Sequence, residues 1–124
     1  MAKFRCLVVE DSPTMRQLIV FALRRLPELE VVEASDGVDA LRKLPGARTD
    51  LVLTGVNMPI MDGLRLVSLM KSNPLYKEIP VAIMTADDAP GDREKGLALG
   101  ARACIPKPIQ PNALAKVVRE ILGI

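Results

Sequence analysis

The sequence predicts an α/β fold, with five parallel strands alternating with five helices in a single domain spanning residues 1–124. Three observations indicate this class. Short apolar runs rich in β-branched residues recur along the chain, amphipathic segments of helical period follow them, and Pro, Gly or capping residues mark the boundaries. Because a helix follows each strand, we expect parallel pairing, right-handed crossovers and helices on both faces of the sheet.

The first half of the chain predicts two strand and helix units. Residues 4–9 are expected to form a buried strand, and Ser12 is expected to cap the following helix. The apolar face of that helix is expected to comprise Met15, Leu18, Ile19, Ala22, Leu23 and Leu26, with Pro27 ending the helix. Residues 30–34 predict a second strand, and residues 38–44 a short helix that Pro and Gly close.

The second half predicts three further units. Strands are expected at residues 51–54, 80–85 and 103–105, and helices from Leu64 to about Asn73, from Asp88 or Ala89 through Pro90 to Gly100, and at residues 111–122. The fourth helix has a thin apolar face of Leu97, Ala98 and Leu99. Gly91 and Gly96 each cost about 0.5–1 kcal/mol inside a helix, so we expect this helix to be the least stable.

Composition excludes several functional classes. Seventeen basic and fifteen acidic residues leave a net charge of +2 without blocks of like charge, which does not indicate a nucleic-acid or membrane surface. No apolar stretch reaches the ~18 residues of a bilayer span, and no signal peptide is recognisable, so we expect a cytoplasmic protein. Histidine is absent, which removes imidazole bases and metal ligands. Cys6 and Cys104 lack metal-ligand spacing and are expected to be buried thiols.

Polar residues gather at the expected carboxyl ends of the strands, where α/β sheets bind their ligands. They are Glu10 and Asp11 after the first strand, Gly55 and Asn57 after the third, Thr85 and Asp87 after the fourth, and Lys107 after the fifth. Carboxylates and carbonyls suit Mg²⁺, while a hydroxyl and an ammonium suit phosphate oxygens. This combination predicts a phosphoryl site.

With these motifs the whole chain resembles the receiver domain of two-component response regulators, in the single-domain format of the chemotaxis regulator CheY. The motifs are Glu10-Asp11, the loop Asn57-Met58-Pro59-Ile60-Met61-Asp62-Gly63, Thr85-Ala86 and Lys107-Pro108. Four motifs in this order at receiver spacing are far more specific than any one alone. The resemblance implies a flavodoxin-like sheet of strand order 2-1-3-4-5 and a cis Lys107-Pro108 bond.

The resemblance also implies a role for each site residue. The metal ligands would be Glu10, Asp11 and the backbone carbonyl of Asn57, and the phosphoryl-binding residues Thr85 and Lys107. Lys107 would pair with the phosphoryl group or, beforehand, with the phosphoacceptor carboxylate. In the family that acceptor is an Asp three residues before the Met-Pro of the loop, and here the position is Gly55.

Gly55 has no nucleophile, so aspartyl phosphorylation at this position is chemically impossible. No neighbour obviously substitutes, because Thr54 is expected to face the other side, Asn57 carries an amide and Asp62 ends the loop. With two carboxylates instead of three, Mg²⁺ binding is expected to be weak. Two interpretations stay open, a natural pseudo-receiver and a change introduced to inactivate a working regulator. The intact remainder of the site favours recent loss or introduction.

Cys104 is a second departure from the family pattern. Receivers often carry a Tyr or Phe three residues before the lysine, which swings inward when the threonine moves toward the phosphoryl group. Cys104 cannot act as that large switch, and the chain holds only three aromatic residues, Phe4, Phe21 and Tyr76.

The function that the resemblance implies is phosphorelay signalling by protein–protein contact, not enzymatic turnover. The partners would be a sensor histidine kinase and an output protein, through the face of the fourth helix, fifth strand and fifth helix. The alternative is a small phosphatase of the haloacid dehalogenase type, because residues 11–14 faintly resemble its nucleophile loop; the second acid and a cap domain are missing. A third possibility is a free anion between Thr85 and Lys107 that mimics a phosphoryl group.

Overall fold

The computed structural model describes residues 3–86 and 90–124, and within them the chain forms one five-stranded sheet. The strands are β1 (Phe4–Val9), β2 (Leu29–Ala34), β3 (Leu51–Gly55), β4 (Val81–Ala86) and β5 (Ala103–Lys107). Their order across the sheet is β2-β1-β3-β4-β5, and all four neighbouring pairs are parallel. The predicted fold class and strand order are confirmed.

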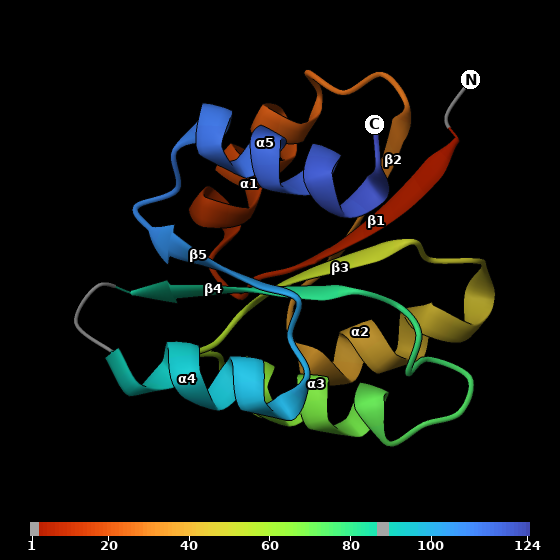
Figure 1. Ribbon diagram of the computed structural model, residues 1–124, viewed down its shortest axis with the longest axis vertical. Coiled ribbons are helices and arrows are strands. Elements are labelled where there is room, and N and C mark those ends of the chain that lie inside the picture. The colour runs from red at the N-terminus through yellow and green to blue at the C-terminus, as the bar shows by residue number, and fades with distance from the viewer. Residues whose placement is uncertain (1–2, 87–89) are drawn as a thin grey trace.

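Helices cover both faces of this sheet (Figure 1). They are α1 (Pro13–Leu23), α2 (Gly37–Lys43), α3 (Gly63–Lys71), α4 (Pro90–Leu99) and α5 (Pro111–Leu122), with a 3₁₀ turn, η1 (Leu44–Gly46), after α2. Helices α1 and α5 lie on one face, and α2, α3 and α4 on the other. None of the helices in the described part of the chain is long and apolar enough to span a bilayer. The layering leaves the carboxyl ends of all strands at one edge, open to the loops that follow them.

Side-chain caps begin three of the helices. The Ser12 hydroxyl accepts a hydrogen bond from the Met15 amide at 3.2 Å, as the sequence predicts for α1. Asp36 caps α2 in the same way, and Asp62 caps α3 by accepting from the Arg65 amide at 2.8 Å. Asp62 therefore has a structural role at the start of α3.

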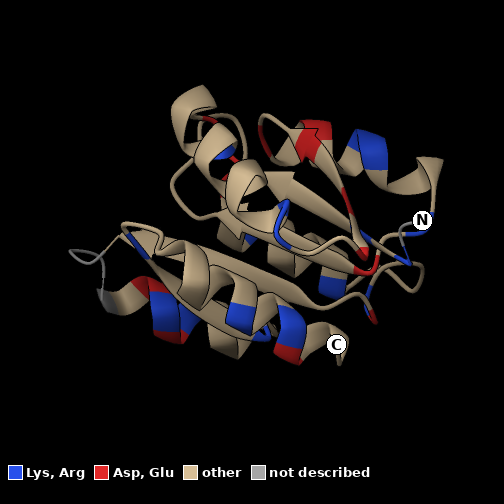
Figure 2. Ribbon diagram, turned by 90° about the horizontal axis from the view of Figure 1, so that it is seen from above, with Lys and Arg blue, Asp and Glu red and all other residues tan. Residues whose placement is uncertain are grey.

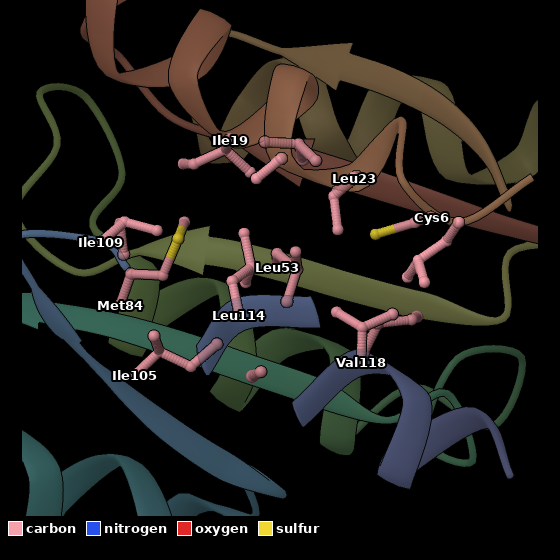
Figure 3. Packing of buried hydrophobic residues seen from close by; sticks show 14 residues of the cluster. Cys6, Ile19, Leu23, Leu53, Met84, Ile105, Ile109, Leu114 and Val118 are labelled. Atoms are coloured by element: carbon pink, nitrogen blue, oxygen red, sulfur yellow. The ribbon is translucent and has the colours of Figure 1, made fainter. Parts of the chain in front are cut away.

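The core consists of two apolar layers, one on each face of the sheet. Alternate residues of β1 enter different layers, Cys6 and Val8 on the side of α1 and α5, Leu7 and Val9 on the other. Figure 3 shows the first layer, which holds buried side chains of α1, α5, β1, β3, β4 and β5, with Cys6 beside Leu23. Burial raises the pKa of the Cys6 thiol, which stays protonated. The prediction of a buried thiol holds for Cys6, whereas Cys104 is only half-buried.

Helix α1 differs from its prediction at two points. It ends at Leu23, and turns rather than helix lead to Pro27. Leu18, assigned to the buried face, is 40% exposed, whereas Ile19 and Leu23 are fully buried. Residues follow one another at about 100° around a helix, so Leu18 lies at the margin of the apolar face centred on Ile19 and Leu23. When that face packs on the sheet, Leu18 stays in solvent.

The apolar face predicted for α4 is wrong. Leu97 and Leu99 are 40% and 39% exposed, and Ala98 is exposed as well. The helix approaches the sheet through Gly96, where an added Cβ would overlap the side chain of Ile83. Close approach of backbone and sheet thus explains a glycine that propensity alone counts as unfavourable. Asp87, Asp88 and Ala89, which include the expected start of this helix, lie outside the described residues.

Strand ends also extend beyond the predictions. β5, predicted to end at Ile105, continues through Pro106 to Lys107, which a proline permits because β5 is an edge strand. β3, predicted to end at Thr54, includes Gly55, and β4, predicted to end at Thr85, includes Ala86. The Lys107–Pro108 bond is cis, as the family resemblance implies. Lys107 is therefore held by the sheet, at the last position of β5.

We predict that Gly63→Ala destabilises the protein by about 1–3 kcal/mol, because an added Cβ would overlap the Gly55 carbonyl oxygen and lie 3.0 Å from the Val56 Cα. Gly91→Ala is the matched control. That position has no atom within 4 Å of an added Cβ, and alanine there gains up to about 1 kcal/mol. Urea denaturation of both variants measures the difference, and equal stability of the two would contradict the packing described.

Candidate functional site

An ion pair joins the first and last strands at the carboxyl edge of the sheet. Lys107, the last residue of β5, donates from Nζ to Oε1 of Glu10, the residue after β1, at 3.0 Å. β1 and β5 are not neighbours, since β3 and β4 lie between them. The two side chains therefore meet across the end of the sheet, beside Gly55 at the end of β3.

Every oxygen of Glu10 has a partner. The residue is only 2% exposed, and its second carboxylate oxygen accepts from the Ser12 amide at 3.1 Å. Its backbone carbonyl accepts from Arg16 Nη1 at 2.7 Å, while Arg16 Nε pairs with Glu33 at 3.0 Å. Burying a carboxylate is costly unless hydrogen bonds and an opposite charge compensate it, and here both do.

The carboxylate of Glu10 occupies the space into which a side chain at position 55 would extend. A Cβ added to Gly55 would lie 2.8 Å from Glu10 Oε1 and 3.6 Å from its Cδ. The oxygen that approaches Gly55 is the one that receives the Lys107 ammonium. Beside Gly55, the lysine thus has as its partner a carboxylate that follows another strand, β1.

Thr54, next to Gly55 on β3, does not offer a free hydroxyl. It is fully buried, and its Oγ1 donates to the Gly55 carbonyl at 2.9 Å. The hydroxyl therefore bonds to the backbone of β3 itself.

Thr85 and Cys104 form a separate contact on β4 and β5. Thr85 Oγ1 and Cys104 Sγ lie 3.2 Å apart, within hydrogen-bonding distance. Thr85 is 7% exposed and Cys104 is half-buried. The threonine that the sequence assigns to phosphoryl binding thus has its hydroxyl beside a thiol, and the lysine assigned to the same task has its ammonium on Glu10.

The residues expected to hold Mg²⁺ differ in exposure and in their contacts. Asp11 and Asn57 are exposed, whereas Glu10 is buried with its oxygens on Lys107 and Ser12. In residues 3–86 and 90–124, no three His, Cys, Asp or Glu side chains lie close enough together to hold a metal ion. Carboxylate and carbonyl oxygens suit Mg²⁺, and in this structure the carboxylate oxygens of Glu10 are hydrogen-bonded to Lys107 and Ser12.

Three features of the site were not predicted from the sequence. They are the pairing of Glu10 with Lys107, the bond from Arg16 to the Glu10 carbonyl, and the left-handed backbone of Ile60. A basic residue one turn into the helix after an acidic strand end was the available signal for Arg16. Ile60 has a φ of 69°, unusual for a β-branched residue, and its side chain is 82% exposed. Nothing in its local pattern indicates this conformation.

Removing the lysine charge is expected to lower stability. We predict that Lys107→Met costs about 2 kcal/mol, because it leaves the buried carboxylate of Glu10 without its cation. Lys43→Met is the matched control, since Lys43 pairs with Asp39 on the surface at 3.2 Å and such pairs contribute about 0.5 kcal/mol or less. Chemical denaturation compares the two variants, and equal losses would show that the Glu10 pair is no stronger than a surface pair.

Comparison with known proteins agrees with this fold and with the motifs that carry it. The model of the response regulator receiver domain family matches residues 6–119. The chemotaxis protein CheY1 of Helicobacter pylori is 38% identical over 120 residues, which cover 96% of this chain and 97% of that protein.

Solved structures give the same result. The chemotaxis protein CheY4 of Vibrio cholerae superposes with a TM-score of 0.87 at 33% identity, covering 97% of this chain and 99% of that chain. The receiver domain of the sensor histidine kinase PA1611 of Pseudomonas aeruginosa, solved with a magnesium ion coordinated in its active site cleft, superposes with a TM-score of 0.88 at 28% identity, covering 99% and 100% of the two chains. By its sequence, its fold and the arrangement of its strand ends, the chain belongs to the response regulator receiver domain family.

Proposed function

We propose that this receiver domain acts in two-component signalling by protein–protein contact and is not phosphorylated at its acceptor position. Gly55 carries this proposal. It ends β3, where the family has its acceptor aspartate, and it offers no oxygen to attack a phosphorus atom. The remaining residues of the site, among them Glu10, Thr85 and Lys107, are present and lie at the same edge of the sheet.

The surroundings of Gly55 support the proposal. The Thr54 hydroxyl is buried on a backbone carbonyl, and Asp62 caps α3. Both groups have structural partners that they would have to leave in order to react. No observation favours the phosphatase alternative.

Phosphorylation tests the proposal directly. Incubation with acetyl phosphate and Mg²⁺ is expected to leave the mass of the protein unchanged, because no acceptor is available. Gly55→Asp is expected to gain one phosphoryl group, whereas Gly55→Ala, the matched control, gains none. Intact-mass spectrometry distinguishes these results. A stable phosphoryl adduct on the parent protein, for example on Asp11, contradicts the proposal.

The same experiment bears on the origin of Gly55. Labelling of Gly55→Asp supports a recently lost or introduced change in an otherwise competent site. Failure of the folded variant to label supports a long-standing pseudo-receiver. Weak Mg²⁺ binding is part of the proposal under either interpretation, because the site has lost one carboxylate.

The proposed contact face comprises α4, β5 and α5. The edge strand β5 lies between these two helices, which cover opposite faces of the sheet (Figure 1). Figure 2 shows basic and acidic segments interspersed along α4 and α5 on one side of the molecule. Leu97 and Leu99 of α4 are partly exposed among these charges. Mixed charge with exposed leucines suits a reversible contact with a sensor kinase or an output protein.

We predict that Leu97→Asp weakens binding to either partner at least tenfold, because it places a charge in the apolar part of this face, a loss of about 1.4 kcal/mol. Leu75→Asp is the control, since Leu75 is 80% exposed and lies in the connection between α3 and β4. Calorimetric titration of the partner measures both. Equal effects of the two substitutions would place the contact elsewhere.

A further inference from the structure

We propose that Glu10 replaces the missing carboxylate at position 55 as the partner of Lys107, so that the lysine ammonium is the resident cation of this acidic edge and Mg²⁺ must compete with it for Glu10. The proposal concerns the site of the proposed function and rests on that function for the identity of the site. It assigns Glu10 a positioning role that the family motif does not contain.

The first argument is steric. Glu10 Oε1 is both 3.0 Å from Lys107 Nζ and 2.8 Å from where a Cβ on residue 55 would lie. Two non-bonded heavy atoms of this kind do not approach so closely, so any side chain at position 55 would displace the carboxylate. The present position of the Glu10 carboxylate therefore depends on the glycine at position 55.

The second argument is electrostatic. The carboxylate of Glu10 is buried, and the lysine side chain that pairs with it is only 25% exposed, so solvent screens the pair less than a surface pair. Arg16 adds a second positive group, on the Glu10 carbonyl at 2.7 Å. A divalent cation that approached Glu10 would meet two cationic side chains, of which Arg16 also pairs with Glu33.

Two exclusive arrangements follow from these contacts. Glu10 either stays on Lys107 or turns outward toward Asp11 to ligate a metal ion, and then the lysine is released. Removing the ammonium, or displacing Glu10 with a methyl group at position 55, should thus favour metal binding even though neither change adds a ligand.

The test is a Mg²⁺ titration of the full chain without any phosphoryl donor, followed by calorimetry and by the backbone NMR shifts of residues 10, 11 and 57. Lys107→Met and Gly55→Ala are expected to bind Mg²⁺ at least fivefold more tightly than the parent. Lys43→Met, which removes a lysine from a surface pair, should bind with the parent's affinity. In the parent, the side-chain signals of Lys107 should shift with the same midpoint as the Glu10 amide.

A Mg²⁺ affinity of Lys107→Met that is unchanged or weaker than that of the parent overturns the proposal. Absence of Mg²⁺ binding in every variant overturns it too, because the lysine ammonium is then not what keeps Glu10 from binding the metal. If circular dichroism shows that Lys107→Met does not fold, the Mg²⁺ affinity of Gly55→Ala and the NMR shifts of the Lys107 side chain in the parent test the proposal instead. A phosphoryl adduct on the parent would contradict the proposed function and leave this competition intact. Equal Mg²⁺ affinities of the parent and the variants would contradict the competition and leave the proposed function intact.

Discussion

The buried carboxylate of Glu10 is the constraint on which the site depends. Burying a carboxylate to 2% exposure is costly unless the fold supplies a cation and hydrogen-bond donors. The parallel sheet meets this need by bringing all strand ends to one edge, so that Lys107 reaches Glu10 although the two residues are 97 positions apart. The Ser12 amide completes the set because only three residues separate the end of β1 from the start of α1.

Gly55 changes both the space and the charge at this edge. It removes the side chain that would fill the end of β3, and the carboxylate of Glu10 takes that space. It also removes a charge that would compete for Lys107. Family membership and the proposed loss of phosphorylation are thus separate matters in this chain: the receiver fold and most of its motifs are present, while position 55 carries no side-chain oxygen.

Local patterns predicted most of the fold, for reasons that are visible in the structure. Apolar runs rich in β-branched residues mark the strands, and apolar residues at helical spacing mark the helices. Ser12 caps α1, as its position in the sequence predicts. The errors lie where tertiary contacts override the pattern. Leu18 lies at the margin of the α1 stripe, and α4 packs through Gly96, not through its leucines. Propensity does not show how closely a helix will approach its sheet.

The functional site, too, was predictable from the sequence only in part. Which residues form it, and that position 55 is a glycine, could be predicted from the order of the motifs and their places at the strand ends, because parallel topology brings those ends together.

What the sequence determined by itself is therefore the fold class, the family and the absence of a nucleophile at position 55, since these depend on residue identity and local period. What only the tertiary structure decided is which groups pair: Glu10 with Lys107, and Thr85 with Cys104. Those choices depend on the space that each side chain finds around it, and the space beside Gly55 that Glu10 fills exists only once the carboxyl ends of β1, β3 and β5 lie at the same edge of the sheet.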